Sequence, residues 1–277
     1  MTIQFQQLHP VLQSVAVIVA AIALLYLVLC LLALVVARPM MFPAPASSYD
    51  DSYPTVTLQT KEGLAVAGIF LENSEAKYTL LFSHGNGEDI GYAQEFLEEL
   101  RNLGFNVFAY DYPGYGLSEG TPSEESCHEA ILAAYHYLVE ERNIDPVTIV
   151  AHGRSLGGAP SVELASKHPV GGVILESSFV SAFRVMTKVT FFPFDRFRNL
   201  EKIPKINCPS LIIHGERDEV VPFWHGQRLH QVAPEPKTFL PLPDASHNDV
   251  RSVGGTTYFN AIRSFADSLP ASKEKSP

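Results

Sequence analysis

One serine in this chain lies in a pattern suited to nucleophilic catalysis, the sequence Gly153-Arg154-Ser155-Leu156-Gly157. The preceding residues, 147–151, are apolar and mostly β-branched, which predicts a buried strand, and residues 159–167 have the apolar spacing of a helix. A tight turn between strand and helix holds a serine in sparsely allowed backbone geometry with its Oγ exposed. We therefore predict that Ser155 is a nucleophile. The backbone N–H of Leu156, at the helix N-terminus, is the first predicted oxyanion donor.

The same G-x-S-x-G pattern occurs a second time, around Ser118. There the next residues are Thr121-Pro122-Ser123, so no helix begins at the turn. The pattern alone is therefore not specific, and we predict that Ser118 is a loop residue.

A serine nucleophile needs a base, and the base needs an orienting partner. Residues 211–214 are a predicted strand, and Asp218 follows its carboxyl end, where catalytic groups gather in open parallel sheets. His247 follows the last predicted strand, 238–242. We predict that His247 takes the serine proton and that Asp218 holds the imidazole.

Other side chains compete for these two roles. Glu216, Glu219 and Asp244 are the alternative acids, and three further histidines lie at strand ends, His84, His152 and His214. In hydrolases with this elbow the order along the chain is serine, acid, histidine. That order excludes the three histidines as the base.

The second oxyanion donor is expected on the loop after the strand 78–83, which reads His84-Gly85-Asn86-Gly87. The glycines allow a substrate to approach closely, and the Asn86 N–H is the predicted donor. The alternative is a plain glycine turn.

Strands and helices alternate around these residues. The alternation predicts a mostly parallel sheet with helices on both faces, in a domain spanning 55–270, with 271–277 as a C-terminal tail. Residues 55–59 and 64–71 read as a hairpin, and Gly254-Gly255 as a bend in the closing helix. Residues 177–209 are irregular and aromatic and are predicted to form a short lid.

Residues 11–37 carry no charged side chain and are long enough for a transmembrane helix. We predict a signal anchor there, preceded by a tail, 1–10, and followed by a linker, 38–54. A signal peptide cleaved after Ala37 is the alternative. Arg38 follows the span and nothing basic precedes it, which favours a cytoplasmic hydrolase domain.

Composition and motif spacing argue against several classes of ligand. A net charge of −10 without basic runs argues against nucleic acid. Three cysteines show no framework spacing, so disulfides are not required. No HExxH or clustered metal spacing is present, and we expect neither a metal nor any other cofactor.

Five motifs together resemble a known family: HGNG at 84–87, DYPGYGLSEG at 111–120, GRSLGG at 153–158, HGERDEVVP at 214–222 and ASHND at 245–249. Over residues 55–268 the chain resembles the α/β-hydrolase-domain serine hydrolases, a group that includes membrane-anchored enzymes and protein depalmitoylases. The resemblance implies an α/β-hydrolase fold, the triad Ser155, Asp218 and His247, and an oxyanion hole formed by Asn86 and Leu156. It also implies hydrolysis of esters or thioesters through an acyl-enzyme. Depalmitoylases of this group attach through a cysteine-rich amino terminus, where this chain has an apolar span.

Two alternative functions remain open at the level of sequence. A serine aminopeptidase is the alternative among enzymes. An inactive α/β-hydrolase used as a binding module is the alternative outside them, and it would be expected to lack a residue of the triad or the oxyanion hole.

The lid suggests the substrate. Its apolar side chains, too many for a short loop to bury, are expected to line the path to Ser155 or to face the bilayer; they are Phe179, Phe183, Val185, Met186, Val189, Phe191, Phe192, Phe194 and Phe197. We therefore expect a small acyl ester or thioester as the substrate, with medium or long acyl chains preferred over acetyl.

Overall fold

A computed structural model describes residues 2–270 of the chain, and side chains from residue 12 onward. The predicted C-terminal tail, 271–277, lies outside the described residues. The chain divides into two compact units, with the boundary between Met41 and Phe42.

The first unit is a single helix, α1 (Thr2–Met41). Its segment Leu12–Met41 has a mean hydropathy of 3.2 and is almost entirely exposed within the structure. Thirty helical residues span about 45 Å, more than the roughly 30 Å hydrocarbon core of a bilayer. By length and composition the helix could therefore cross a membrane. It includes much of the predicted tail and continues past Arg38, because helical hydrogen bonding does not stop where apolar composition does.

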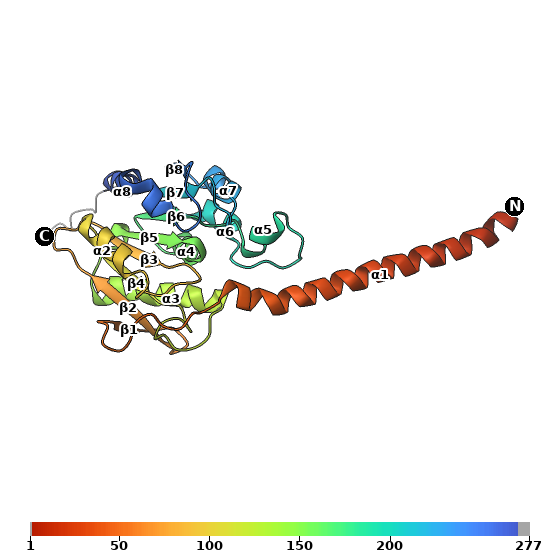
Figure 1. Cartoon of the computed structure of the whole chain (residues 1–277), viewed down its shortest axis with the longest axis horizontal. Helices are drawn as coiled ribbons and strands as arrows, with labels where there is room; N and C mark the ends of the chain where they lie inside the picture. The colour runs from red at the N-terminus through yellow and green to blue at the C-terminus, as the bar shows by residue number, and fades with distance from the viewer. Residues whose placement is uncertain (1, 271–277) are drawn as a thin grey trace. The chain divides into compact units, whose positions relative to one another are not determined.

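The second unit is built on one eight-stranded sheet with the order β1-β2-β4-β3-β5-β6-β7-β8 (Figure 1). The strands are β1 (Val56–Gln59), β2 (Ala65–Leu71), β3 (Thr79–Ser83), β4 (Asn106–Tyr110), β5 (Ile149–Arg154), β6 (Gly172–Glu176), β7 (Ser210–Gly215) and β8 (Lys237–Leu242). β1 pairs antiparallel with β2, and β2 antiparallel with β4. All later pairs are parallel, from β3–β4 to β7–β8. The predicted hairpin and the mostly parallel sheet are confirmed.

Helices cover both faces of this sheet. One face carries α2 (Gln94–Asn102) and α8 (Val250–Asp267), whose apolar side chains join one core cluster with the sheet. The other face carries α3 (Glu124–His136), which continues as the π-helix η1 (Tyr137–Glu141), together with α4 (Gly158–Lys167) and α7 (Trp224–Val232). α8 is kinked at Gly255, whose φ is 47°, so the predicted bend in the closing helix is confirmed.

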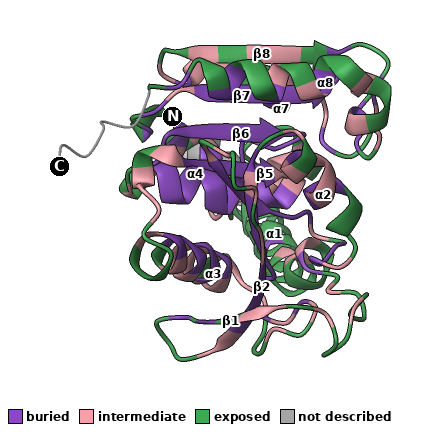
Figure 2. Ribbon diagram, turned by 90° about the vertical axis from the view of Figure 1, so that its left-hand side faces the viewer, coloured by how far each residue is buried: buried purple, intermediate pink, exposed green. Residues whose placement is uncertain are grey.

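The central strands are the most buried part of the molecule. Every residue of β6 and β7 is buried, and in β5 only Arg154 is partly exposed (Figure 2). Parallel strands need crossover helices, and these shield both faces from water. The loops after β3, β5, β7 and β8 leave the same edge of the sheet, so residues distant in sequence can meet there.

Five further short helices fall between the strands in the chain order. They are η2 (Pro146–Thr148), η3 (Ser155–Gly157), α5 (Ala182–Thr187), α6 (Asn199–Lys202) and η4 (Ile203–Lys205).

Residues 42–53, within the predicted linker, belong to the second unit and pack against its core and lid. Phe42 is buried, and its ring lies 6.0 Å from that of Phe197. The rings of Tyr49 and Tyr53 lie 5.1 Å apart, and both pack against the core cluster. Composition predicted a linker here, but these aromatic side chains gain burial by lying on the domain.

Candidate active site

Ser155 is the first residue of η3, on the sharp turn directly after β5, with a left-handed φ of 52°. The glycines on either side are required by close packing. A Cβ on Gly153 would lie 2.2 Å from the Gly157 carbonyl oxygen, and one on Gly157 would lie 1.9 Å from the Ser83 carbonyl oxygen. The observed turn therefore has the geometry that the G-x-S-x-G pattern predicted, with its backbone pressed against the loop after β3.

The structure brings Ser155, His247 and Asp218 together. His247 Nε2 lies 3.0 Å from Ser155 Oγ, and His247 Nδ1 lies 2.8 Å from Asp218 Oδ2. Asp218 Oδ1 accepts hydrogen bonds from the backbone N–H groups of Val220 at 3.0 Å and Val221 at 2.7 Å. The arrangement can hold the imidazole with one nitrogen toward the carboxylate and the other toward the serine.

Asp218 is held in its ionised form. Burial by itself would raise its pKa, but hydrogen bonds from His214, His247 and the Val221 backbone outweigh burial and hold the pKa well below the usual range. His214 Nε2 lies 3.3 Å from Asp218 Oδ2 and 2.8 Å from the Val221 carbonyl oxygen. Chain order excluded His214 as the base, and the structure places it against Asp218, a contact that the sequence did not indicate.

The competing residues lie elsewhere. Asp244 is exposed and pairs with Arg217 at 2.7 Å. Glu216 and Glu219 are also exposed. Ser118 Oγ accepts a hydrogen bond from the Ala67 backbone N–H at 2.9 Å, in the loop after β4. None of these four side chains contacts His247 through a hydrogen bond in the described part of the chain.

The two residues predicted to supply the oxyanion donors lie near Ser155. Leu156 is its neighbour in η3, and Asn86 lines the same cavity as Ser155. The loop that carries Asn86 is fixed by two tyrosines of the segment after β4. Tyr112 Oη donates to the His84 carbonyl at 2.7 Å, and Tyr115 Oη donates to the Asn86 carbonyl at 2.9 Å.

A cavity of about 650 Å³ opens at Ser155 and His247, and charged side chains line it. Glu88 forms an ion pair with Arg154. Glu176, at the end of β6, is buried and accepts a hydrogen bond from Tyr258 Oη at 2.6 Å. Arg251 contacts Glu95 and Glu99. Sequence reasoning missed these residues. The position of Glu176 at a strand's carboxyl end was a signal that could have identified it.

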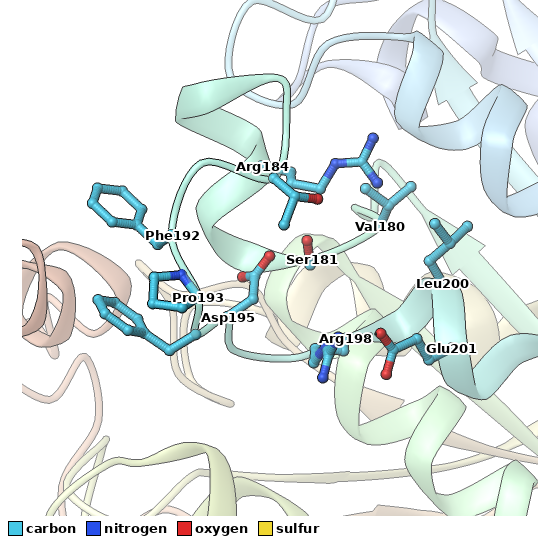
Figure 3. A pocket seen from close by; sticks show the side chains of 11 residues that line it. Val180, Ser181, Arg184, Phe192, Pro193, Asp195, Arg198, Leu200 and Glu201 are labelled. Atoms are coloured by element: carbon cyan, nitrogen blue, oxygen red, sulfur yellow. Dashed lines mark ion pairs between the residues drawn. The ribbon is translucent and has the colours of Figure 1, made fainter. Parts of the chain in front are cut away.

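None of the nine apolar lid residues lines this cavity. Phe183, Phe192 and Phe194 pack on one another instead, with ring centroids 5.4–5.5 Å apart. A separate cavity of about 150 Å³ lies among residues of the lid (Figure 3). The expectation is that several lid side chains line the path to Ser155 or face the bilayer. None of the nine lines the cavity at Ser155, because three of the phenylalanines pack on one another, and contact with a bilayer stays a prediction.

The lid nevertheless begins in contact with Ser155. Ser178 Oγ donates to the Ser155 carbonyl at 3.1 Å, and the Arg184 guanidinium lies over the Trp224 ring at 5.1 Å. Met186 and Val189 are 72% and 61% exposed. An apolar surface is thus presented to the surroundings on a segment that touches Ser155.

Known proteins resemble this chain in sequence. A sequence model of the family described as "Serine aminopeptidase, S33" matches residues 74–197. Human alpha/beta hydrolase domain-containing protein 17B is 40% identical over 225 residues, which are 79% of this chain and 77% of that protein. The Caenorhabditis elegans protein aho-3, also named as an alpha/beta hydrolase domain-containing protein, is 41% identical over 193 residues. That match spans 69% of this chain and 58% of aho-3.

Solved structures share the fold at lower identity. The esterase Pf2001 of Pyrococcus furiosus superposes with a TM-score of 0.70 at 18% identity, covering 82% of this chain and 98% of the esterase. A serine hydrolase homologue from Coxiella burnetii has a TM-score of 0.62 at 18% identity, covering 78% and 99%.

Proposed function

Because the chain belongs to the α/β-hydrolase domain-containing family that includes protein 17B, we propose that it is a membrane-anchored serine hydrolase acting on carboxylic esters or thioesters. The observation that carries the proposal is the hydrogen-bonded series Ser155–His247–Asp218, with separations of 3.0 and 2.8 Å. Geometry of this kind suits acyl transfer through a covalent intermediate.

In the proposed reaction, Ser155 Oγ attacks the substrate carbonyl while His247 Nε2 takes its proton. Asp218, ionised and bound at Nδ1, stabilises the imidazolium that forms. The N–H groups of Asn86 and Leu156 stabilise the oxyanion. His247 then returns the proton to the leaving group, an acyl-enzyme remains on Ser155, and water releases the acid by the same steps.

Two surfaces near Ser155, the charged cavity and the apolar lid, suggest where the two parts of a substrate would bind. The cavity lined by Glu88, Arg154 and Glu176 suits a polar leaving group. The exposed lid side chains Met186 and Val189 suit an acyl chain or the bilayer that holds it. We therefore retain medium or long acyl esters and thioesters as the proposed substrates.

A fluorophosphonate probe tests the nucleophile on the full chain, because it phosphonylates activated serines. Wild type and Ser118→Ala should be labelled, and Ser155→Ala should not. Hydrolysis by Ser155→Ala should fall by up to about a millionfold, since triad residues act as a unit. Labelling that persists in Ser155→Ala and disappears in Ser118→Ala would show that Ser118 is the nucleophile.

The anchor is proposed from the apolar helix. Full-length protein should remain with membranes through alkaline carbonate, and deletion of residues 2–41 should release it. Recovery of a mature chain beginning at Arg38 would instead identify a cleaved signal peptide. Protease protection of the domain in sealed vesicles tests the cytoplasmic side.

A peptidase is the second candidate, because one carboxylate oxygen of Glu88, Oε2, is buried without a hydrogen-bond partner among the described residues. A carboxylate in this cavity could accept a substrate's α-amine. Aminoacyl amides hydrolysed faster than acyl esters, with Glu88→Gln removing that preference, would favour the peptidase.

A further inference from the structure

The segment that follows α1 is hydrogen-bonded to the loop that carries Asn86. The Ser48 backbone N–H donates to Asp89 Oδ2 at 2.7 Å, and Ser48 Oγ donates to the other oxygen of the same carboxylate. Tyr49 Oη donates to Asp111 Oδ2 at 2.5 Å and accepts from the Leu117 N–H at 3.2 Å. Burial and the Asp111 carboxylate raise the pKa of Tyr49, so its hydroxyl keeps its proton at neutral pH.

Two glycines make this seating possible. A Cβ on Gly91 would lie 2.6 Å from Ser48 Oγ. One on Gly116, whose φ is 50°, would lie 1.9 Å from Asp111 Oδ2 and 2.6 Å from Tyr49 Oη. The surface under Ser48 and Tyr49 is therefore shaped to receive them closely.

Asp111 connects Tyr49 to the oxyanion loop, residues 84–90. Its side chain is fully buried just after β4. Asp111 Oδ1 accepts a hydrogen bond from the Ile90 N–H at 2.8 Å, which ties the loop to the carboxylate. His84 Nε2 lies 3.4 Å from the same oxygen and has no hydrogen-bond partner among the described residues. On the other side of the ring, His84 Nδ1 donates to the Gly85 carbonyl at 2.7 Å.

That carbonyl belongs to the peptide that carries the proposed oxyanion donor. The Gly85 C=O and the Asn86 N–H are parts of one planar trans peptide and point in opposite directions. Holding the oxygen toward His84 therefore turns the N–H to the other side of the loop. The next peptide is held as well, because Tyr115 Oη binds the Asn86 carbonyl at 2.9 Å.

We propose that Ser48 and Tyr49 are positioning residues for the oxyanion hole, with Tyr49 acting through Asp111 and its hydrogen bond from Ile90 on the loop that carries Asn86. The inference rests on the proposed function. The segment next to the membrane helix is then part of the catalytic framework, although neither side chain touches the substrate. Without the Tyr49 hydroxyl, a buried carboxylate loses a donor and the loop can relax away from the geometry the transition state needs.

The test compares Tyr49→Phe with Tyr53→Phe in the full-length protein. Tyr53 is the matched control because its hydroxyl is buried in the same segment and has no hydrogen-bond partner within the described chain. Loss of an oxyanion donor lowers kcat by about 10²–10³, and a misaimed donor should cost less, about 10- to 50-fold. We expect that fall in kcat for Tyr49→Phe, with KM and the melting midpoint close to wild type and with Tyr53→Phe unchanged.

A transition-state analogue separates positioning from general loosening. A trifluoromethyl ketone forms a tetrahedral adduct whose oxyanion occupies the hole, so its inhibition constant for Tyr49→Phe should rise by the same factor as kcat/KM falls. The double variant Tyr49→Phe/Asp111→Asn should lose little more than Asp111→Asn alone, because the two residues act in series.

Three results would overturn the proposal: equal kcat in Tyr49→Phe and Tyr53→Phe, an unchanged inhibition constant, or multiplicative losses in the double variant. If Tyr49→Phe does not fold, Ser48→Ala replaces it; a lower kcat at unchanged KM supports the proposal, and an unchanged kcat refutes it. Absence of fluorophosphonate labelling at Ser155 in wild type would refute the proposed function instead, so the two failures are distinguishable.

Discussion

Two segments border Ser155, the oxyanion loop at residues 84–90 and the lid at residues 177–209, and they are built in opposite ways. In the oxyanion loop, two carbonyl groups accept hydrogen bonds from buried tyrosines. The segment after α1 donates to Asp89 of the loop and to Asp111, which binds the loop at Ile90. The middle of the lid exposes Met186 and Val189, and its phenylalanines pack mainly on one another.

This difference indicates which part of the reaction, transition-state stabilisation or acyl-chain binding, each segment is suited to. Donors that stabilise developing charge must be aimed before the reaction, so their support has to be rigid. Apolar contacts to a flexible acyl chain are non-directional and depend on the area that is buried, so the lid does not need to be rigid. Substitutions in the oxyanion loop or its supports should therefore change kcat by the same factor for all substrates. Substitutions in the lid should change KM by a factor that depends on the length of the substrate's acyl chain.

After loss of the proposed nucleophile, Ser155, the largest effect is expected at the proposed acid, Asp218. Asp218→Asn keeps the shape but can leave His247 in the wrong tautomer, a change that lowers kcat about 10⁴-fold in chymotrypsin-like serine proteases. Asp244→Asn is the matched control, because Asp244 is exposed and pairs with Arg217. The loss should be the same for acetyl and dodecanoyl esters in steady-state kinetics. Reversed losses for the two variants would show that Asp244 is the acid.

A smaller effect is expected at the lid. Met186→Ser/Val189→Ser should raise KM for a dodecanoyl ester about fivefold and leave KM for an acetyl ester unchanged, because each buried CH₂ contributes about 0.8 kcal/mol. Val253→Ser, which changes an exposed valine of α8, is the control. The measurement is kcat and KM across p-nitrophenyl esters of two to sixteen carbons, below micelle concentrations. If kcat instead fell by the same factor for every ester, the lid would act as the oxyanion loop does, and the proposed difference between the two segments would be wrong.

The smallest effect concerns the ion pairs that tie the carboxyl end of the lid to α4. Glu163 contacts Lys202 of α6 at 2.7 Å and also Lys167. Burial by itself would raise the pKa of Glu163, but the two lysines outweigh burial and lower the pKa from 4.5 to about 2. A lowered pKa in the folded state stabilises the fold above pH 4.5, and this contribution is lost as the pH falls toward 2.

Glu163→Gln should therefore lower the free energy of unfolding by about 2 kcal/mol at pH 7, and by much less near pH 2. Denaturation of the solubilised chain, followed by fluorescence of its single tryptophan, Trp224, measures this. Glu201→Gln is the control, because Glu201 forms an exposed pair with Arg198 (Figure 3) that should contribute at most about 1 kcal/mol. A pH-independent loss would show that the lysines do not stabilise the Glu163 carboxylate.

Local sequence determined most of the fold and much of the candidate site. Strand and helix periodicities are set by neighbouring residues, so the alternation around Ser155 and the hairpin of β1 and β2 could be predicted without the structure. The elbow required only the glycines around Ser155, and chain order with strand ends selected Asp218 and His247. All three side chains meet in the structure because their loops leave one edge of a parallel sheet.

Other features depended on contacts between distant residues. Tyr49 and Asp111 are 62 positions apart, and nothing in the composition of residues 38–54 indicated that this segment would bind the oxyanion loop. The conformation of the loops brings His214 beside Asp218 and Glu88 beside Arg154, and neither contact follows from the sequence pattern. The apolar lid residues were identified from sequence, but whether they faced Ser155 or one another depended on packing. Periodicity specifies which side chains need burial, and only the tertiary structure decides which partner buries them.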